Sequence, residues 1–152
     1  EGICRLPNLR YTTFLQDELV AVVHTGSKLS LPDEITPEDL SRIPLVLRER
    51  GSGTLDVFER ALSEHNMKLS SLNVLLYLGS TESIKLFLEH TDCIGIVSIR
   101  SISRELLSGT FRVIEIKGMP MLREFCFAQP QGQESGLSQV LMQFAMHHNK
   151  KL

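Results

Sequence analysis

Two short turns carry most of the residues that could do chemistry in this chain. The first runs from Arg48 to Thr54 with the sequence RERGSGT, and the second runs from Gly79 to Ser83 with the sequence GSTES. Each follows an apolar run, precedes a helical pattern and contains no proline. Such strand-to-helix turns present backbone N–H groups and hydroxyls to a small polar ligand. Two of them in one chain predict a binding cleft rather than an active site.

The first turn matches none of the standard nucleotide-binding or catalytic motifs. It lacks the third glycine of a dinucleotide fingerprint, the Gly-Lys-Ser/Thr of a P-loop and the G-x-S-x-G frame of a nucleophile elbow. Two interpretations remain open. The turn is a plain helix N-cap, or Ser52, Gly53 and Thr54 bind an anion at the positive end of a helix, beside Arg48 and Arg50.

The second turn matters because of its position in the chain, after the strand that follows the first turn. Ser80 or Thr81 caps a helix there, as happens at the start of many helices. The carboxyl ends of neighbouring parallel strands meet at one edge of a sheet, so Gly79, Ser80 and Thr81 should lie near the first turn. Ser98 and Arg100 close a third strand, and we expect them to line the same pocket.

The remaining residues argue against several classes of protein. The five histidines have no Asp or Cys at metal or triad spacing, so we expect no catalytic residue, metal or cofactor. Cys4, Cys93 and Cys126 form no C-x-x-C, which predicts reduced thiols in the cytoplasm. A net charge of −2 gives no nucleic-acid footprint. No apolar run reaches the roughly 18 residues of a membrane span.

The elements that must position the two turns alternate along the chain. Strand-like apolar runs cover residues 19–23, 45–47, 74–78, 94–97 and 125–128, and a more mixed run at 111–116 is expected to be an edge strand. Five helical patterns lie between and after these runs. One begins at Thr36-Pro37, and the others cover residues 55–62, 84–88, 102–107 and 137–144. The pattern at 102–107 ends at Gly109. This order predicts an α/β fold with a doubly wound, mostly parallel sheet and helices on both faces.

These segments, in this order, resemble the effector-binding domain of LysR-type transcriptional regulators. Residues 17–23 resemble the strand that enters the second lobe of this domain, and residues 44–54 resemble the middle of the domain. Residues 80–85 resemble the start of the helix after its third strand, and residues 105–111 resemble a helix-to-strand junction. Residues 123–127, together with the final helix, resemble the return of the chain to the first lobe. One departure is Cys93-Ile94-Gly95, which keeps only the second glycine of the family's Gly-x-Gly. The resemblance covers nearly the whole chain.

The resemblance implies a type 2 periplasmic-binding-protein-like lobe with part of a second lobe. Residues 1–18 would be a remnant of the first lobe and hinge, 19–120 the second, effector-binding lobe, and 121–152 the return strand and C-terminal helix of the first lobe. The hinge strands would fall near 15–20 and 121–125. A small effector would bind between the lobes, with Arg48, Ser52, Gly53 and Thr54 on the second-lobe wall and Gly79, Ser80 and Thr81 beside them.

We therefore expect a regulatory domain that binds a small, anionic effector and is not an enzyme. Its partners would be further copies of itself, as a dimer or tetramer, and DNA only through a winged helix-turn-helix absent from this chain. We expect no membrane partner. The alternatives are an extracytoplasmic solute-binding receptor of the same fold and a small α/β hydrolase using Ser52.

The chain begins with Glu1-Gly2, so we interpret it as a piece of a longer protein. The apolar stripe of the last helix would then lack most of the first lobe as its partner. This stripe consists of Leu137, Val140, Leu141 and Phe144. An exposed stripe of this size favours self-association, which we expect of the isolated chain.

Overall fold

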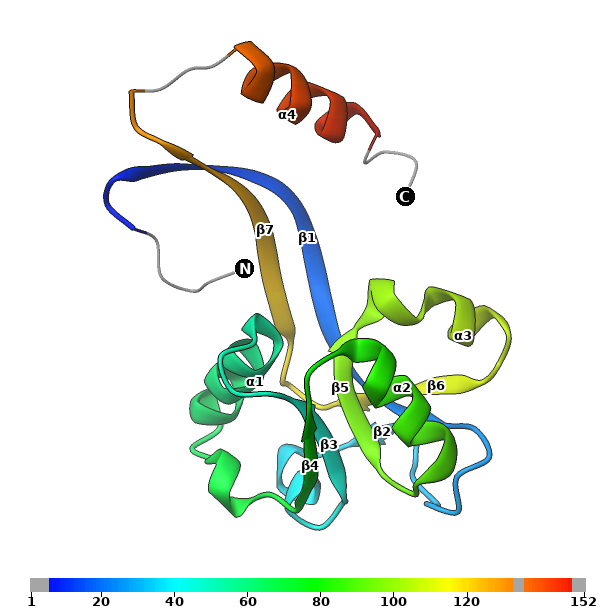
Figure 1. Ribbon diagram of the computed structural model, residues 1–152. Helices are drawn as coiled ribbons and strands as arrows, with labels where there is room; N and C mark the ends of the chain where they lie inside the picture. Colours follow the sequence, from blue (N-terminus) through cyan, green and yellow to red (C-terminus); the bar gives the residue numbers. More distant parts are fainter. Residues whose placement is uncertain (1–5, 133–135, 149–152) are drawn as a thin grey trace. The chain divides into compact units, whose positions relative to one another are not determined.

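The computed structural model describes residues 6–132 and 136–148, which fall into two compact units (Figure 1). One unit is continuous and runs from Asp17 to Arg123; it is called the lobe below. The other combines residues 1–16 with residues 124–152 and is called the two-segment unit. Cys4 lies outside the described residues. The predicted division at residues 18 and 120 stays a prediction about which parts form each lobe of the family.

Seven strands form one sheet among the described residues. Its order is β2-β6-β1-β5-β3-β4, and β7 pairs with β1. The strands are β1 (Leu9–His24), β2 (Glu34–Ile35), β3 (Leu45–Arg48), β4 (Val74–Leu78), β5 (Ile94–Ser98), β6 (Phe111–Ile116) and β7 (Met121–Pro130). All five strand-like runs and the mixed run at 111–116 are therefore strands.

The sheet is parallel where the two turns lie and antiparallel around β1. Strand β3 runs parallel to both β4 and β5, as the alternating pattern predicts. Strand β1 runs antiparallel to β5 and β6. The prediction that 111–116 forms an edge strand is wrong, because β2 pairs with Glu115 and Ile116 at the end of β6. A two-residue strand leaves no period in the sequence, so β2 could not be foreseen.

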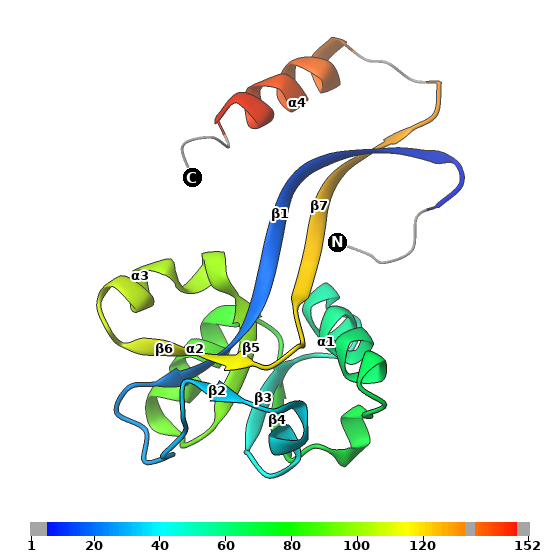
Figure 2. The same cartoon turned by 180° about the vertical axis from the view of Figure 1, so that it is seen from behind.

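Helices cover both faces of the lobe's sheet (Figures 1 and 2). The helical elements are η1 (Pro37–Ser41), α1 (Gly53–Glu64), η2 (Leu69–Ser71), α2 (Thr81–His90), η3 (Ile99–Ile102), α3 (Ser103–Leu107) and, in the two-segment unit, α4 (Gly136–His148). Leu19, Ala21 and Val23 of β1 join the core cluster that contains the apolar side of α1. Val20 and Val22 join the cluster that contains Ile84 and Leu88 of α2. Both faces of β1 are thus buried, as its continuous apolar run predicts.

Helix stripes and caps follow the sequence pattern closely. Leu55, Phe58, Ala61 and Leu62 of α1 are all buried. Thr36 and Asp39 form a capping box at the predicted start of η1, with the Thr36 N–H 2.9 Å from Asp39 Oδ2. This element is a 3₁₀-helix of five residues rather than a full α-helix.

Two groups of apolar residues are more exposed in the structure than the sequence pattern predicts. Strand β4 is the outermost strand beside β3, and its Leu75, Leu76 and Tyr77 are exposed rather than covered on both faces. Leu107 of the short α3 is 90% exposed, while its neighbour Leu106 packs against the core cluster that contains α2 residues. The stripe of α4 is exposed at all four residues, as expected of a stripe without its partner: Leu137, Val140, Leu141 and Phe144.

Gly95 stands where β5 passes closest to α2. A Cβ placed on it would lie 3.0 Å from Cγ2 of Ile84 and 3.1 Å from Cδ1 of Leu88. The one glycine that this chain keeps from the family's Gly-x-Gly is therefore a packing residue, which lets α2 lie close to the sheet.

Gly95→Val should lower the free energy of unfolding by about 1–3 kcal/mol, because the added methyl groups overpack the contact with α2. Urea denaturation followed by circular dichroism measures the change. Gly79→Val is the matched control, since no heavy atom lies within 4 Å of a Cβ at that position, and it should change the free energy by less than about 0.5 kcal/mol. Equal effects of the two substitutions would contradict this account of Gly95.

Cys93 should resist thiol reagents in the folded chain, because its side chain is buried and the thiolate is the reactive form. Burial, with a smaller contribution from Asp92, raises the pKa of Cys93 to about 11. The neutral thiol's contribution to stability is complete below its unfolded pKa of about 8.5 and is lost as pH rises toward 11. Mass spectrometry after maleimide treatment at pH 8 should find Cys126 modified and Cys93 intact until the chain is denatured. Equal labelling of Cys93 and Cys126 in the folded chain would contradict the protection of Cys93 by burial.

Candidate functional site

The sheet topology brings several strand ends to one edge of the lobe. Strands β3 and β4 end in register at Arg48 and Leu78, and the N–H of Glu49 donates to the Leu78 carbonyl at 3.1 Å. Strand β1 runs the opposite way, so that Leu19 faces Ser98 at the end of β5. The start of the lobe part of β1 therefore lies at the same edge of the sheet as the carboxyl ends of β3, β4 and β5.

The first turn forms a capped helix start. Gly51 has a φ of +86°, in the left-handed region that favours glycine, and leads the chain into Ser52. Ser52 is the N-cap of α1, and its Oγ accepts from the Leu55 N–H at 3.2 Å. Gly53 is the first residue of the helix. The N-cap interpretation of the turn is confirmed for Ser52, and the partial positive charge of a 12-residue helix stands at this edge.

Arg48 is held by its neighbour in the sequence. Its Nε and Nη2 donate to the two carboxylate oxygens of Glu49 at 2.8 and 2.9 Å, and its Nη2 also donates to the Gly79 carbonyl at 3.4 Å. The hydrogen bonds from Arg48 hold the pKa of Glu49 below its usual value. The positive charge of Arg48 is thus largely compensated, and its guanidinium links the first turn to the second.

The second turn is also a capped helix start. Ser80 is the N-cap of α2, its Oγ accepts from the Ser83 N–H at 3.1 Å, and the two serine hydroxyls are 2.8 Å apart. Thr81 is the first residue of α2 and is half-buried. The residues predicted at this turn lie beside Arg48 and Glu49, as expected for adjacent parallel strands.

A buried carboxylate organises the other predicted residues. The Asp17 side chain has no exposed surface, and Ser98 Oγ donates to its Oδ1 at 2.7 Å. Arg123 Nε donates to its Oδ2 at 2.8 Å, and Arg100 Nε lies 4.0 Å from its Oδ1. Two guanidinium groups and a hydroxyl therefore surround one carboxylate.

The same network reaches the start of α1. Thr54 is buried in the first turn of the helix, and its Oγ1 accepts from Arg123 Nη1 at 3.3 Å. One arginine thus contacts both Asp17 and the helix start. Arg100 and Arg123 place two guanidinium groups against Asp17, beside a helix N-terminus. This arrangement can bind an anion. Asp17, Thr54, Ser98, Arg100 and Arg123 are called the Asp17 cluster below.

Asp17 and Arg123 were not among the residues predicted from the sequence. They are 106 positions apart, and no local motif relates two residues at that separation. The available signal was their position: each lies near one end of a strand expected to leave the second lobe. An acidic and a basic residue at the two expected crossings could have been paired on that basis.

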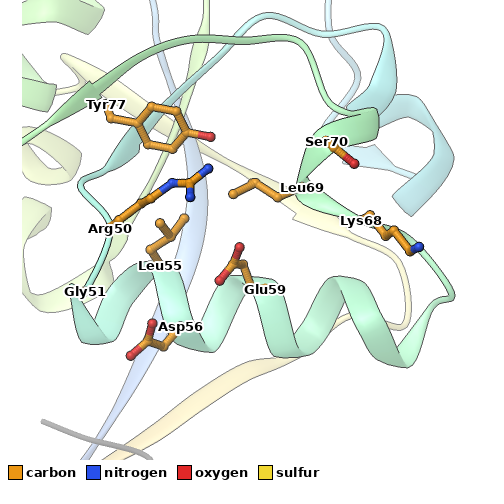
Figure 3. A pocket seen from close by; sticks show the side chains of 9 residues that line it. All are labelled: Arg50, Gly51, Leu55, Asp56, Glu59, Lys68, Leu69, Ser70 and Tyr77. Atoms are coloured by element: carbon orange, nitrogen blue, oxygen red, sulfur yellow. The ribbon is translucent and has the colours of Figure 1, made fainter.

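A hollow on the lobe lies elsewhere, between α1, η2 and β4 (Figure 3). It has a volume of about 450 Å³ and contains none of the nine predicted site residues. Figure 3 shows Glu59 pointing from α1 toward Arg50 and Tyr77. Two basic side chains, Arg50 and Lys68, share it with two acidic ones, so it has no net preference for an anion. Of these two places, the Asp17 cluster is therefore the better candidate for binding an anion.

Metal chemistry and membrane insertion find no support in the described residues. No group of three or more His, Cys, Asp or Glu side chains there could hold a metal ion. No described helix combines the length and the apolar character needed to cross a membrane.

An α/β lobe that gathers hydroxyls and arginines at its strand ends defines a ligand-binding domain of the periplasmic-binding-protein-like fold. The model of the LysR substrate binding domain matches residues 1–150, so the chain belongs to this family. The family consists of effector-binding domains of transcriptional regulators and is not a family of enzymes.

Two relatives in sequence are regulators. The HTH-type transcriptional activator CmpR of Synechocystis sp. is 29% identical over 144 residues, which is 94% of this chain and 46% of that protein. The uncharacterized HTH-type transcriptional regulator YeiE of Escherichia coli is 33% identical over 116 residues, or 76% and 38% of the two chains. The chain thus spans less than half the length of these relatives.

Solved structures show the same fold. The regulatory domain of Synechocystis CcmR in complex with 2-PG superposes with a TM-score of 0.80 at 25% identity, over 95% of this chain and 69% of that one. The effector binding domain of QuiR in complex with shikimate gives 0.76 at 20% identity, over 95% and 67%.

Arg123→Ala should lower the free energy of unfolding by about 3–5 kcal/mol, because it leaves the Asp17 carboxylate buried without its main partner. Arg60→Ala is the control, since Arg60 is exposed and makes one 3.4 Å hydrogen bond to the Leu122 carbonyl; we expect a change within about 0.5 kcal/mol. Denaturant titrations of both variants test this. A small effect at Arg123 would show that Asp17 is not a buried charge that depends on it.

Proposed function

We propose that this chain is the effector-sensing part of a cytoplasmic LysR-type transcriptional regulator and that its effector is a small anion. The observation that carries the proposal is the Asp17 cluster, which combines two arginines, two hydroxyls and the N-terminus of α1 around one carboxylate. Two guanidinium groups beside a helix N-terminus suit a carboxylate or phosphate group. The family membership supports binding of a small molecule at such an edge.

The proposed contacts differ in strength among the nine predicted residues. Thr54, Ser98 and Arg100 belong to the cluster, and Ser52 and Gly53 supply the helix start beside it. Arg48, Gly79, Ser80 and Thr81 form a second group around the Arg48–Glu49 pair, where the positive charge is compensated. We propose the first group as the anion-binding part and the second group as the flanking wall.

The partners of the whole protein are also part of the proposal. The relatives CmpR and YeiE are HTH-type regulators, and this chain matches less than half of each. We propose that the full-length protein binds DNA through a helix-turn-helix outside this chain and acts as a homo-oligomer, a dimer or tetramer, whose arrangement responds to the effector. A solute-binding receptor has less support, because these relatives are regulators. The Ser52 hydroxyl serves as a helix cap, which gives no support to a hydrolase.

Calorimetric titration of the full-length protein with a panel of organic acids, including 2-PG and shikimate, should identify at least one ligand. Thr54→Val and Arg100→Gln should each weaken its binding about tenfold or more, because each removes a hydrogen-bond or charge partner of an anion. Arg50→Gln, in the hollow of Figure 3, should leave the affinity unchanged. The opposite pattern would move the site to that hollow, and no binding by any acid would count against an anionic effector.

A further inference from the structure

The Asp17 carboxylate occupies the groups that an effector anion would use. Its Oδ2 accepts from Arg123 Nε at 2.8 Å, and its Oδ1 accepts from Ser98 Oγ at 2.7 Å with Arg100 Nε at 4.0 Å. Three proposed effector contacts thus already face a negative charge supplied by the protein. A second anion at this place must share the guanidinium groups with Asp17.

Accessibility differs among these partners in a way that favours sharing. The Asp17 side chain is completely buried, the Arg123 side chain is 13% exposed, and the Arg100 side chain is 46% exposed. An anion from solvent can therefore approach Arg100 and the edge of Arg123, while Asp17 stays in the interior. Arg123 also contacts Thr54, so a shift of its guanidinium would be felt at the start of α1.

The two partners of the pair stand at the ends of the lobe. The division into compact units falls between Gln16 and Asp17 in β1 and between Arg123 and Glu124 in β7. These are the only two places where the chain passes between the units. The Asp17–Arg123 pair therefore joins the first and last residues of the lobe, where both strands leave it.

We propose that Asp17 is an internal counter-anion of the effector site: it holds Arg123 and Arg100 while the site is empty and competes with an incoming effector anion, so that binding weakens the Asp17–Arg123 pair and changes the stability of the two strands that leave the lobe. This inference rests on the proposed function and adds the regulation of its site. It makes Asp17 a residue that opposes binding rather than one that supports it.

The direction of one mutational effect separates competition from a merely structural role. Asp17→Asn keeps the shape of the side chain and one acceptor oxygen, which can still accept from Arg123 while the Ser98 hydroxyl accepts from the new amide, but it removes the competing charge. We expect the full-length protein carrying Asp17→Asn to bind anions roughly fivefold more tightly, or more, because attraction by the two arginines is no longer offset. If Asp17 served only to orient Arg123, the same substitution would weaken binding.

The increase in affinity caused by Asp17→Asn should depend on the charge of the anion that is titrated. Coulomb energies scale with ligand charge, so the logarithm of the gain for sulfate should be about twice that for acetate. Raising the salt concentration should reduce both gains. Asp33→Asn is the matched control: it makes the same change in net charge at an exposed ion pair with Arg112, 3.1 Å long, outside the cluster, and should leave both affinities unchanged.

Titration calorimetry with sulfate, acetate and 2-PG gives the deciding result, with thermal denaturation to establish that each variant is folded. Tighter binding by Asp17→Asn supports the proposal, including the case in which wild type binds none of the probes detectably. Unchanged or weaker binding, or no binding by both proteins, overturns it. The proposed function fails by a different result, namely a wild-type protein that binds its effector with no loss in Thr54→Val or Arg100→Gln.

Hydrogen exchange keeps the test decisive if Asp17→Asn is too unstable to titrate. Saturating sulfate should speed amide exchange at residues 9–16 of β1 and 124–130 of β7 in the wild-type protein, while exchange in β3 and α1 slows or stays constant. Binding without any change at the two strand segments would overturn the transmission through the Asp17–Arg123 pair.

Discussion

A carboxylate without solvent contact is the interaction on which this lobe depends. An ionised Asp17 in the interior is costly unless charged and hydrogen-bonding groups surround it, and Ser98 and Arg123 provide these at 2.7 and 2.8 Å. Their positions tie the end of β5 and the start of β7 to the middle of β1. Thr54 extends the network to α1 through the same arginine. One buried charge thus contacts groups from β5 and β7 and, through Arg123, is linked to α1 at the candidate edge.

The antiparallel course of β1 is what makes this arrangement possible. The parallel strands β3, β4 and β5 bring only their carboxyl ends to the edge, and these ends carry the two serine-capped helix starts. Strand β1 runs the other way and delivers a residue from its interior instead. The site therefore combines backbone amides from helix starts with a charge from a strand that passes through. We propose that the hydroxyls supply hydrogen bonds and the arginines supply charge to a small anion.

Prediction from the sequence succeeded where the cause is local. Buried strands, the caps at Ser52 and Ser80, and the apolar side of α1 follow from patterns within a few residues, and all are present. It failed where the cause is a neighbour in space. The exposure of β4 follows from its place beside a single partner, and the pairing of β2 with β6 needs two segments about 80 residues apart. The Asp17–Arg123 pair also joins residues that are distant in the sequence, so the prediction of the candidate site did not include these two residues.

The division of the chain into one continuous and one two-segment unit also bears on how it folds. The two-segment unit includes residues 9–16 of β1 and residues 124–130 of β7, which are separated by roughly 100 residues of chain. Closing a disordered loop of that length costs about 4 kcal/mol in entropy. Once the lobe is folded, its ends are already adjacent and this cost is absent. Pairing of β1 with β7 outside the lobe therefore costs less entropy once the folded lobe holds its two ends together.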